Sequence, residues 1–320
     1  MRISAVMAVY DGGRFLEGQL ASLAAQSRPP DELVVGDDGS IDGSDALVER
    51  FADSVGFPVR LHRNPENLRA TGNFARLIGL CEGDVIVTAD QDDAWFPGKL
   101  ARIEAEFARS PEVGLVFSDA DLIDGEGRPI GNRLWPSVRF SPSAARSIER
   151  GDAFATLLRR PVITGATMAF RTDLREIFLP IPHSWTHDHW IGLMVAAASR
   201  IRPIAEPLMQ YRKHAENQVG VLGASAVERL GTSLARPRAR LLEEAARFVE
   251  LREALASRLP GRADLLTRVD GKVTHALARG SLPDARASRI PVILRELATG
   301  RYSRYSGGPL AGVRDLIAAP

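Results

Sequence analysis

The first half of the chain alternates between short apolar runs and segments whose apolar positions recur at helical spacing. The runs ISAVMAVY, ELVVG, VRLHR and DVIVTA end in turn-forming or charged residues, which is typical of strands in a covered sheet. The intervening segments predict helices that pack on that sheet. Their apolar faces are formed by Leu16, Leu20 and Leu23, by Phe74, Leu77, Ile78 and Cys81, and by Leu100, Ile103 and Phe107. This alternation predicts an α/β fold with a mainly parallel sheet flanked by helices.

The rhythm changes after VGLVFSDADLID. DGEGRP predicts a turn, PVITGATMAFR and EPLMQYR predict strands, and HDHWIGLMVAAAS predicts a helix. From residue 231 onward helices dominate, and we expect GRYSRYSGG to form a loop within them. The chain therefore divides into residues 1–230, with halves 1–122 and 123–230, and a helical C-terminal extension, 231–320. The face expected to be buried in that extension includes Leu241, Ala245, Phe248 and Leu255.

The charge is unevenly distributed, although the whole chain has a net charge of only +1. Residues 231–320 hold 16 Lys and Arg against 9 Asp and Glu, a local charge of +7, which leaves −6 for residues 1–230. The arginines are spread along helices and do not cluster with aromatic residues, which argues against nucleic acid as a partner. Two readings stay open: a solvated helix face, or peripheral contact with an anionic membrane surface.

A single cysteine, Cys81, excludes an intramolecular disulfide and fits a reducing compartment. It lies on an apolar helix face, so we expect a buried, inert thiol. The N-terminal apolar stretch is too short for a secretory signal, and the run WIGLMVAAAS is shorter than the ~20 residues of a spanning helix. We expect a cytoplasmic protein, with attachment to the inner face of the membrane left open.

Acidic residues follow two of the predicted strands. TADQDDAWFP places Asp90, Asp92 and Asp93 directly after the fourth strand, and DDGS places Asp38 after the second. Ligands of open parallel sheets bind beyond the carboxyl ends of the strands. An Asp at such an end can simply cap the next helix, and for DDGS that reading is equally open. One cap cannot use three carboxylates, so DQDD predicts a hard divalent cation such as Mg²⁺ or Mn²⁺.

The motif order resembles that of a known family. DDGS followed by DQDDAW and PGKL is similar to the nucleotide-binding half of the inverting family 2 glycosyltransferases, which have the Rossmann-like GT-A fold. TGATMAFR and HDHWIGLMVAAASRIRPIAEPLMQYRKHAENQVG resemble the acceptor-side half, nearest the rhamnosyltransferase-like branch. The resemblance implies that residues 1–122 bind a nucleotide-sugar, that residues 123–230 form the acceptor side, and that the basic helices are an extension.

The resemblance also implies roles for individual residues on the donor side. Asp92 would bind a metal ion that bridges the diphosphate, Asp90 would lie toward the ribose and the metal, and Asp93 would support them. Ala8 stands where relatives often have a hydroxyl residue, so one contact with the base is expected to be missing. The remaining candidates for contact with the nucleotide-sugar are Tyr10 beside the base, Asp38 on its imide N–H, and Arg69, Asn73, Arg212 and His214.

On the acceptor side, Asp188 matches the catalytic base. An acceptor hydroxyl needs a carboxylate or an imidazole within hydrogen-bond reach, and HSWTHDHW offers both, with His187 and His189 as rival bases. Read without the family, Asp188 is better explained as a first-turn residue that complements a helix dipole, and only the resemblance favours the base. Trp185 and Trp190 could form a sugar platform or simply be buried.

Together these patterns predict a metal-dependent inverting glycosyltransferase that uses a UDP-, dTDP- or GDP-sugar. The expected acceptor is a saccharide or lipid-linked molecule, as in cell-surface polysaccharide or glycoconjugate synthesis. One alternative is a sugar-phosphate nucleotidyltransferase, although YDGGRF is a poor version of the glycine-rich phosphate loop of such enzymes. The other alternative is a non-catalytic nucleotide-sugar binder.

Overall fold

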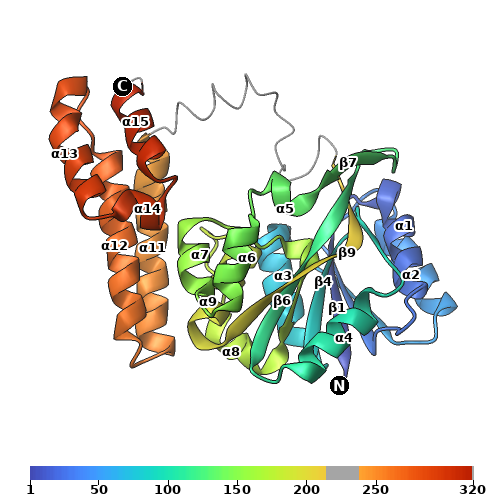
Figure 1. Cartoon of the computed structure of the whole chain (residues 1–320). Helices are drawn as coiled ribbons and strands as arrows, with labels where there is room; N and C mark the ends of the chain where they lie inside the picture. Colours follow the sequence, from blue (N-terminus) through green and yellow to red (C-terminus); the bar gives the residue numbers. More distant parts are fainter. Residues whose placement is uncertain (214–237, 319–320) are drawn as a thin grey trace. The chain divides into compact units, whose positions relative to one another are not determined.

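The computed structural model describes residues 1–213 and 238–318, which form two compact units (Figure 1). The first unit contains residues 1–153 and 162–213. The second contains residues 154–161 together with the C-terminal helices, so this short segment groups with the extension and not with the sheet. The expected boundary at 230/231 lies outside the described residues.

A nine-stranded sheet forms the centre of the first unit, with the strand order β3-β2-β1-β4-β8-β6-β9-β5 and with β7 paired to β6. The predicted apolar runs form strands of this sheet, and three of them are buried, while VRLHR at the sheet edge is only partly buried. The strands are β1 (Ile3–Val9), β2 (Glu32–Asp37), β3 (Val59–Arg63), β4 (Val85–Asp90), β5 (Ala94–Trp95), β6 (Val113–Ile123), β7 (Pro129–Arg133), β8 (Met168–Arg171) and β9 (Arg200–Arg212).

The α/β fold is confirmed, but the sheet is mixed beyond β4. Strands β3, β2, β1 and β4 run parallel, as the alternation predicted. Strand β8 lies antiparallel between β4 and β6, while β6 and β9 are parallel to each other. The segment expected as one long strand, PVITGATMAFR, is a short strand preceded by the 3-10 turn η1 (Gly165–Thr167). That turn brings the chain to the edge of the sheet where the acidic residues lie.

The predicted helix faces are buried against this sheet. Leu16, Phe74, Leu77, Leu100 and Ile103 are all within the core, and Cys81 is buried as expected. The helices of the first unit are α1 (Gly13–Ala24), α2 (Ser44–Ser54), α3 (Arg69–Leu80), α4 (Lys99–Arg109), α5 (Leu134–Ser137), α6 (Pro142–Glu149), η2 (Thr172–Leu174), α8 (Arg175–Phe178) and α9 (His187–Ala198).

The second unit is helical, as expected. The prediction of a loop at GRYSRYSGG is wrong, because Tyr302 and Tyr305, three residues apart, are both buried on one side of a short helix. No helix in residues 1–213 or 238–318 is long and apolar enough to cross a membrane. The helices are α7 (Ala153–Arg159), α11 (Arg238–Arg258), α12 (Ala263–Gly280), α13 (Arg286–Ala298), α14 (Arg301–Tyr305) and α15 (Pro309–Ile317).

Candidate functional site

The carboxyl ends of β1, β2 and β4 lie side by side at one edge of the sheet, which we call the rim. Val9 pairs with Asp37 and Ala8 pairs with Asp90, so the residues after these strands reach the same edge. The chain leaves β1 toward β2 and β3 on one side and returns to β4 on the other. Open α/β sheets bind ligands at such a switch point.

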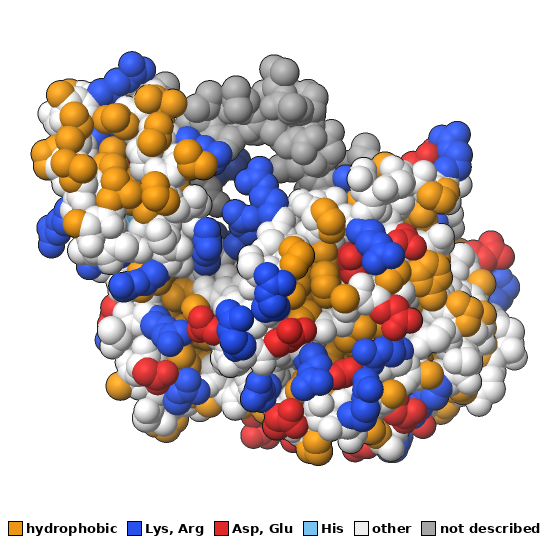
Figure 2. Space-filling view, in the orientation of Figure 1, with side chains coloured by type: hydrophobic (Ala, Val, Ile, Leu, Met, Phe, Trp, Pro, Cys, Tyr) orange, Lys and Arg blue, Asp and Glu red, His pale blue; other side chains and the backbone are white. Residues whose placement is uncertain are grey.

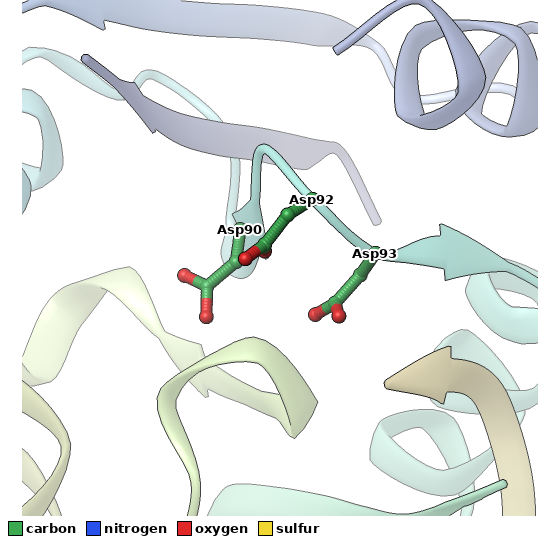
Figure 3. Close-up of side chains that lie close together, drawn as sticks. All are labelled: Asp90, Asp92 and Asp93. Carbon is green, nitrogen blue, oxygen red and sulfur yellow. The ribbon is translucent and has the colours of Figure 1, made fainter. Parts of the chain in front are cut away.

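The aspartate turn after β4 consists of Asp90, Asp92 and Asp93. One carboxylate oxygen from each residue lies within 4.8 Å of those of the other two, and the three side chains extend to the same side of the turn (Figure 3). Oδ2 of Asp93 is buried and has no hydrogen-bond partner among the described residues. A close set of carboxylate oxygens suits hard divalent ions. The residues present therefore fit Mg²⁺ or Mn²⁺.

The protein alone disfavours full ionisation of this turn. Burial, followed by the negative charges of Asp92 and Asp188, raises the pKa of Asp90 to about 7. Burial and the charges of Asp92 and Asp90 raise the pKa of Asp93 well above its usual range. An opposite charge placed between the carboxylates would favour their ionised forms. The raised pKa values of Asp90 and Asp93 therefore agree with the geometry, since both favour a cation among these carboxylates.

A buried lysine faces the aspartate turn. Lys99 opens α4 and has no exposed surface. Its Nζ donates to the main-chain oxygen of Ala166 at 3.0 Å and lies 4.1 Å from the centre of the Trp95 ring. Burial lowers the pKa of Lys99 to about 7, while the charges of Asp93 and Asp90 act in the opposite direction. Lys99 thus supplies part of the positive charge that the carboxylates need.

The loop after β1 presents Tyr10 with 48% of its surface exposed, as stacking on a base would require. Its main-chain N–H donates to Oε1 of Gln91 at 2.9 Å, and Nε2 of Gln91 donates to its main-chain oxygen at 3.0 Å. Asp11, at φ 44°, accepts from the N–H of Ile41 at 2.9 Å. The loop is therefore fastened to the aspartate turn and to the loop after β2.

Asp38 is nearly buried at the end of β2, where Oδ1 accepts from Nδ2 of Asn64 at 2.8 Å and from the N–H of Leu68 at 2.9 Å. Asn73 is buried behind it. Its Oδ1 accepts from Asn64 at 3.1 Å and its Nδ2 donates to the oxygen of Gly36 at 2.8 Å. The amide of Asn73 therefore orients Asn64 behind Asp38, and its contact with the nucleotide-sugar stays a prediction.

Arg212 ends β9 and braces the aspartate turn. Its N–H donates to Oδ1 of Asp93 at 2.9 Å, and its Nε donates to the main-chain oxygen of Asp92 at 2.7 Å. The guanidinium lies over the ring of Phe15 at 4.8 Å. The structure thus brings Arg212 to the predicted site through the backbone of the turn.

The two remaining donor-side candidates are Arg69 and His214. Arg69 is the exposed first residue of α3, in the left-handed conformation at φ 59°, and its N–H donates to Oδ1 of Asn67 at 3.0 Å. Its guanidinium forms no ion pair with a described residue. His214 lies outside the described residues.

Asp188 lies in the first turn of α9, and its charge is among those that raise the pKa of Asp90. Oδ1 accepts from the hydroxyl of Thr186 at 2.6 Å and from the N–H of His189 at 2.7 Å. Oδ2 accepts from the N–H of Gly165 at 3.2 Å. The structure therefore joins Asp188 to the rim, and the same carboxylate stabilises the helix start.

The neighbouring aromatic residues are packed inside the protein. His187 stacks on Phe74 with ring centres 4.3 Å apart, and burial lowers the pKa of His187. Trp185 and Trp190 are almost fully buried, and Nε1 of Trp190 donates to the oxygen of Phe178 at 2.8 Å. The reading of both tryptophans as buried residues is confirmed, in preference to an exposed sugar platform.

The sequence analysis assigned no role to Gln91, Lys99, Gly165 or Tyr211. Three of them stand inside the quoted motifs DQDD, PGKL and TGAT, where motif position was the only signal. Tyr211 lies on β9, and burial followed by the charges of the aspartate turn and of Asp188 raises the pKa of its hydroxyl. Its position could not be read from the sequence, because it depends on the pairing of β9 with β6.

The comparisons with known proteins agree with this geometry. Residues 4–178 match the profile of glycosyl transferase family 2. An uncharacterised glycosyltransferase of Nostoc sp. is 29% identical over 221 residues, which are 68% of this chain and 66% of that protein. An undecaprenyl-phosphate 4-deoxy-4-formamido-L-arabinose transferase of Pseudomonas fluorescens is 30% identical over 209 residues, 62% of this chain and 58% of the relative. The chain thus matches less than two thirds of the length of each relative.

Solved structures share the fold. TarS 1–349 of S. aureus, in complex with UDP-GlcNAc, has a TM-score of 0.57 at 17% identity and covers 99% of this chain and 90% of its own. The mannosyltransferase PcManGT from Pyrobaculum calidifontis, in complex with GDP-Man and Mn²⁺, has a TM-score of 0.53 at 17% identity, covering 98% of this chain and 78% of its own. With the family profile matched over more than half of its length, the chain belongs to glycosyl transferase family 2.

Proposed function

We propose that this protein is a metal-dependent inverting glycosyltransferase, which moves a sugar from a nucleotide-diphosphate donor to a saccharide or lipid-linked acceptor. The observation that carries the proposal is the approach of Asp188 to the aspartate turn at the switch point of the sheet. One carboxylate is thereby available as a base beside a group of carboxylates suited to a cation. Membership of family 2 supports this class of reaction.

The rim residues would hold the donor. Asp92 and Asp90 would ligate Mg²⁺ or Mn²⁺, and Asp93 would support them. When bound, such an ion stabilises the negative charge that develops on the leaving diphosphate. Tyr10, which is exposed beside the turn, would stack on the base, and Asp38 would accept its imide N–H. Gln91 fixes the distance between the base and diphosphate positions, because it bonds to the backbone of Tyr10 from within the aspartate turn.

Asp188 would take the proton of the acceptor hydroxyl. Oδ1 already accepts two hydrogen bonds, whereas Oδ2 accepts one, from Gly165. A carboxylate has about four lone-pair sites, so Oδ2 can accept a further hydroxyl. As the proton passes to Oδ2, the acceptor oxygen would bond to the anomeric carbon from the face opposite the diphosphate. The bond between that carbon and the diphosphate would break in the same displacement, which inverts the configuration.

Donor and acceptor are proposed by analogy. TarS and PcManGT are in complex with UDP-GlcNAc and GDP-Man, which supports UDP-, dTDP- and GDP-sugars as candidate donors. The relative named as an undecaprenyl-phosphate transferase supports a lipid-linked acceptor and a role in cell-surface glycoconjugate synthesis. Such an enzyme would act in the cytoplasm or at the inner membrane face. The likeness to the rhamnosyltransferase-like branch stays a prediction.

The proposal is tested by nucleotide binding followed by product analysis. UDP, dTDP and GDP are titrated into the protein with Mn²⁺ and again with EDTA, and the preferred nucleotide then guides the choice of donor sugar. We expect one nucleotide to bind in a metal-dependent manner and its sugar to be transferred. Release of pyrophosphate from a nucleoside triphosphate and a sugar 1-phosphate would instead indicate the nucleotidyltransferase alternative.

A further inference from the structure

We propose that the outer surface of helices α13 and α15 docks on an anionic lipid bilayer. This surface, which we call the α13–α15 face, exposes apolar side chains whose exposed fractions range from 44% to 69%. Figure 2 shows hydrophobic side chains gathered over this end of the helical unit, with Lys and Arg at the margins and no acidic side chain among them. The α13–α15 face consists of Ile290, Leu294, Leu310, Val313 and Ile317.

The apolar surface of helix α13 extends beyond its buried side. Its inner side places Ile293 in a small core with Tyr302. Ile290 and Leu294, four residues apart, lie on the flank of the helix beside Ile293 and remain exposed. A globular helix normally has a single apolar stripe, which faces its own core. The core accounts for Ile293 but not for the exposed Ile290 and Leu294, so this part of the apolar surface needs a partner.

Helix α15 repeats the arrangement next to it. Leu310, Val313 and Ile317 recur at helical spacing on the exposed side, while Gly312 faces inward, where an added Cβ would lie 3.3 Å from Cγ2 of Ile293. The two helices are also joined by Arg289 of α13, whose Nη1 donates to the main-chain oxygen of Ala318 at 2.7 Å. The exposed apolar residues therefore belong to adjacent helices of one rigid cluster.

The exposed charges between residues 286 and 317 are all positive, while Asp284, just before this stretch, is exposed and pairs with Arg238 at 2.5 Å. No Asp or Glu is exposed between residues 286 and 317, a stretch that the structure describes in full. The two acidic residues of this stretch turn inward: Glu296 pairs with His275 at 2.7 Å, and Asp315 pairs with Arg279 at 2.6 Å. By contrast, α11 and α12 expose Glu243, Glu250, Glu253, Asp264 and Asp270. The exposed arginines of the stretch are Arg286, Arg295, Arg304 and Arg314, none of which forms an ion pair with a described residue.

The combination of exposed apolar side chains with surrounding arginines favours an anionic bilayer as the partner of the α13–α15 face. Apolar side chains surrounded by arginine match a bilayer interface, where acyl chains lie beneath anionic headgroups. A second copy of the chain fits less well, because a two-fold contact would set the same arginine-rich surface against itself. With no exposed carboxylate on the face, like charges would then oppose each other. The net charge of +7 on residues 231–320 acts in the same direction as the local pattern.

The inference rests on the proposed function only for its purpose, which is to bring the enzyme to a lipid-linked acceptor. The test therefore measures binding without donor or acceptor. The full chain is sedimented with vesicles of phosphatidylcholine alone and with vesicles that also contain phosphatidylglycerol, at low and at high salt. The variant Leu294→Glu/Leu310→Glu is compared with Val249→Glu/Leu277→Glu, which places the same two charges at exposed apolar sites on α11 and α12. Circular dichroism and metal-dependent nucleotide binding show whether each variant retains its fold and its rim.

We expect wild type and Val249→Glu/Leu277→Glu to sediment with the anionic vesicles and much less with the neutral ones. The Leu294→Glu/Leu310→Glu variant should partition about tenfold less, or weaker still, because two side chains lose their apolar contact. Raising the salt to about 0.5 M should also weaken binding, since it screens the arginines. Equal sedimentation with neutral and anionic vesicles, or a folded Leu294→Glu/Leu310→Glu variant that is unaffected, would overturn the proposal. So would a lipid-free dimer that only this variant dissociates, since the face would then be a contact between copies. Absence of nucleotide binding in all proteins would count against the proposed function and leave the vesicle result to be judged by itself.

Discussion

Gln91 and Tyr10 exchange two hydrogen bonds, one to the main-chain N–H of Tyr10 at 2.9 Å and one from Nε2 to its main-chain oxygen at 3.0 Å. Gln91 lies within the aspartate turn, whereas Tyr10 follows a different strand. The pair therefore sets the position of the loop after β1 relative to the carboxylates. In the proposed reaction these two elements hold opposite ends of the same nucleotide, so the pair fixes a distance that donor binding requires.

Replacing Gln91 by Ala should weaken nucleotide binding. Loss of both bonds frees the loop that presents Tyr10, and we expect affinity to fall about tenfold, or about 1.4 kcal/mol. Isothermal titration with the preferred nucleotide and Mn²⁺ measures the effect. Gln91→Glu keeps the oxygen that accepts from the N–H of Tyr10 but loses the N–H that donates to its main-chain oxygen. Its nucleotide affinity should therefore lie between those of the wild type and of Gln91→Ala. An affinity equal to wild type in Gln91→Ala would show that the loop is fixed by other contacts.

Asp92→Asn should remove the metal dependence of nucleotide binding while leaving the fold intact. The carboxylate at this position is replaced by a neutral amide, which is a much poorer ligand for a hard cation. Titration of Mn²⁺ monitored by nucleotide binding gives the comparison. Asp121→Asn, which alters an aspartate on β6 of the same unit, serves as the matched control and should behave as wild type. Equal metal dependence in the two variants would contradict the assignment of Asp92.

In the metal-free protein, the stability contributed by Asp90 should fall as the pH rises from about 4 to about 7, while His62, His187 and His275, whose pKa values are lowered by burial, act in the opposite direction over part of this range. The pKa of Asp90 is raised from an ordinary 3.8 to about 7 in the folded state, so the folded protein binds more protons in this window. The stability contributed by the protonated form is full below the lower value and is lost as the pH passes the upper one. The slope from one such group is at most about 1.4 kcal/mol per pH unit. Asp93 acts in the same direction.

Denaturant unfolding at several pH values in EDTA measures this slope. Asp90→Asn should flatten it, and excess Mn²⁺ should reduce it because the ion binds the ionised carboxylates. Lys99 affects the stability at higher pH. Because its pKa is lowered from 10.5 to about 7, the folded protein holds it neutral between these values, and the stability that this contributes is lost as the pH falls from 10.5 to about 7. An identical pH dependence of stability in the wild type and in Asp90→Asn, both without metal, would show that Asp90 does not hold this proton in the folded state.

The sequence predicted the strands and helices around the rim well, because their apolar periodicities are long and are set by burial against one sheet. Leu16, Phe74 and Ile103 were placed correctly for this reason. The mixed half of the sheet was harder to foresee, since nothing local in MAFR indicates that β8 enters antiparallel between β4 and β6. The helix at Tyr302 and Tyr305 was missed because only these two residues, three positions apart, mark its buried side, and their neighbours are Ser, Arg and Gly.

The candidate site residues were recognised by charge and motif, but the residues that hold them in place were not. Asp38 could be named from DDGS, but the contacts of Asn64 and Asn73 behind it depend on how α3 packs beside β2. Lys99 shows the same limit: a lysine after a proline turn is usually exposed, and only the packing of η1 and β9 around it reveals a buried cation. The resemblance to family 2 supplied the role of Asp188, which the residues alone left open.

The central claim is that Asp188 is the base of an inverting transfer, and the rate of sugar transfer by Asp188→Asn tests it most directly. The amide keeps the size of the side chain and can still accept from Gly165, but it cannot take a proton. Transfer is measured at saturating donor, Mn²⁺ and acceptor, beside donor affinity, with His187→Gln and His189→Gln as rival variants. We predict a fall of about 10²–10⁴-fold in Asp188→Asn, with donor and metal affinity nearly unchanged. Near-normal turnover in Asp188→Asn, or a larger loss in either histidine variant, would contradict the account.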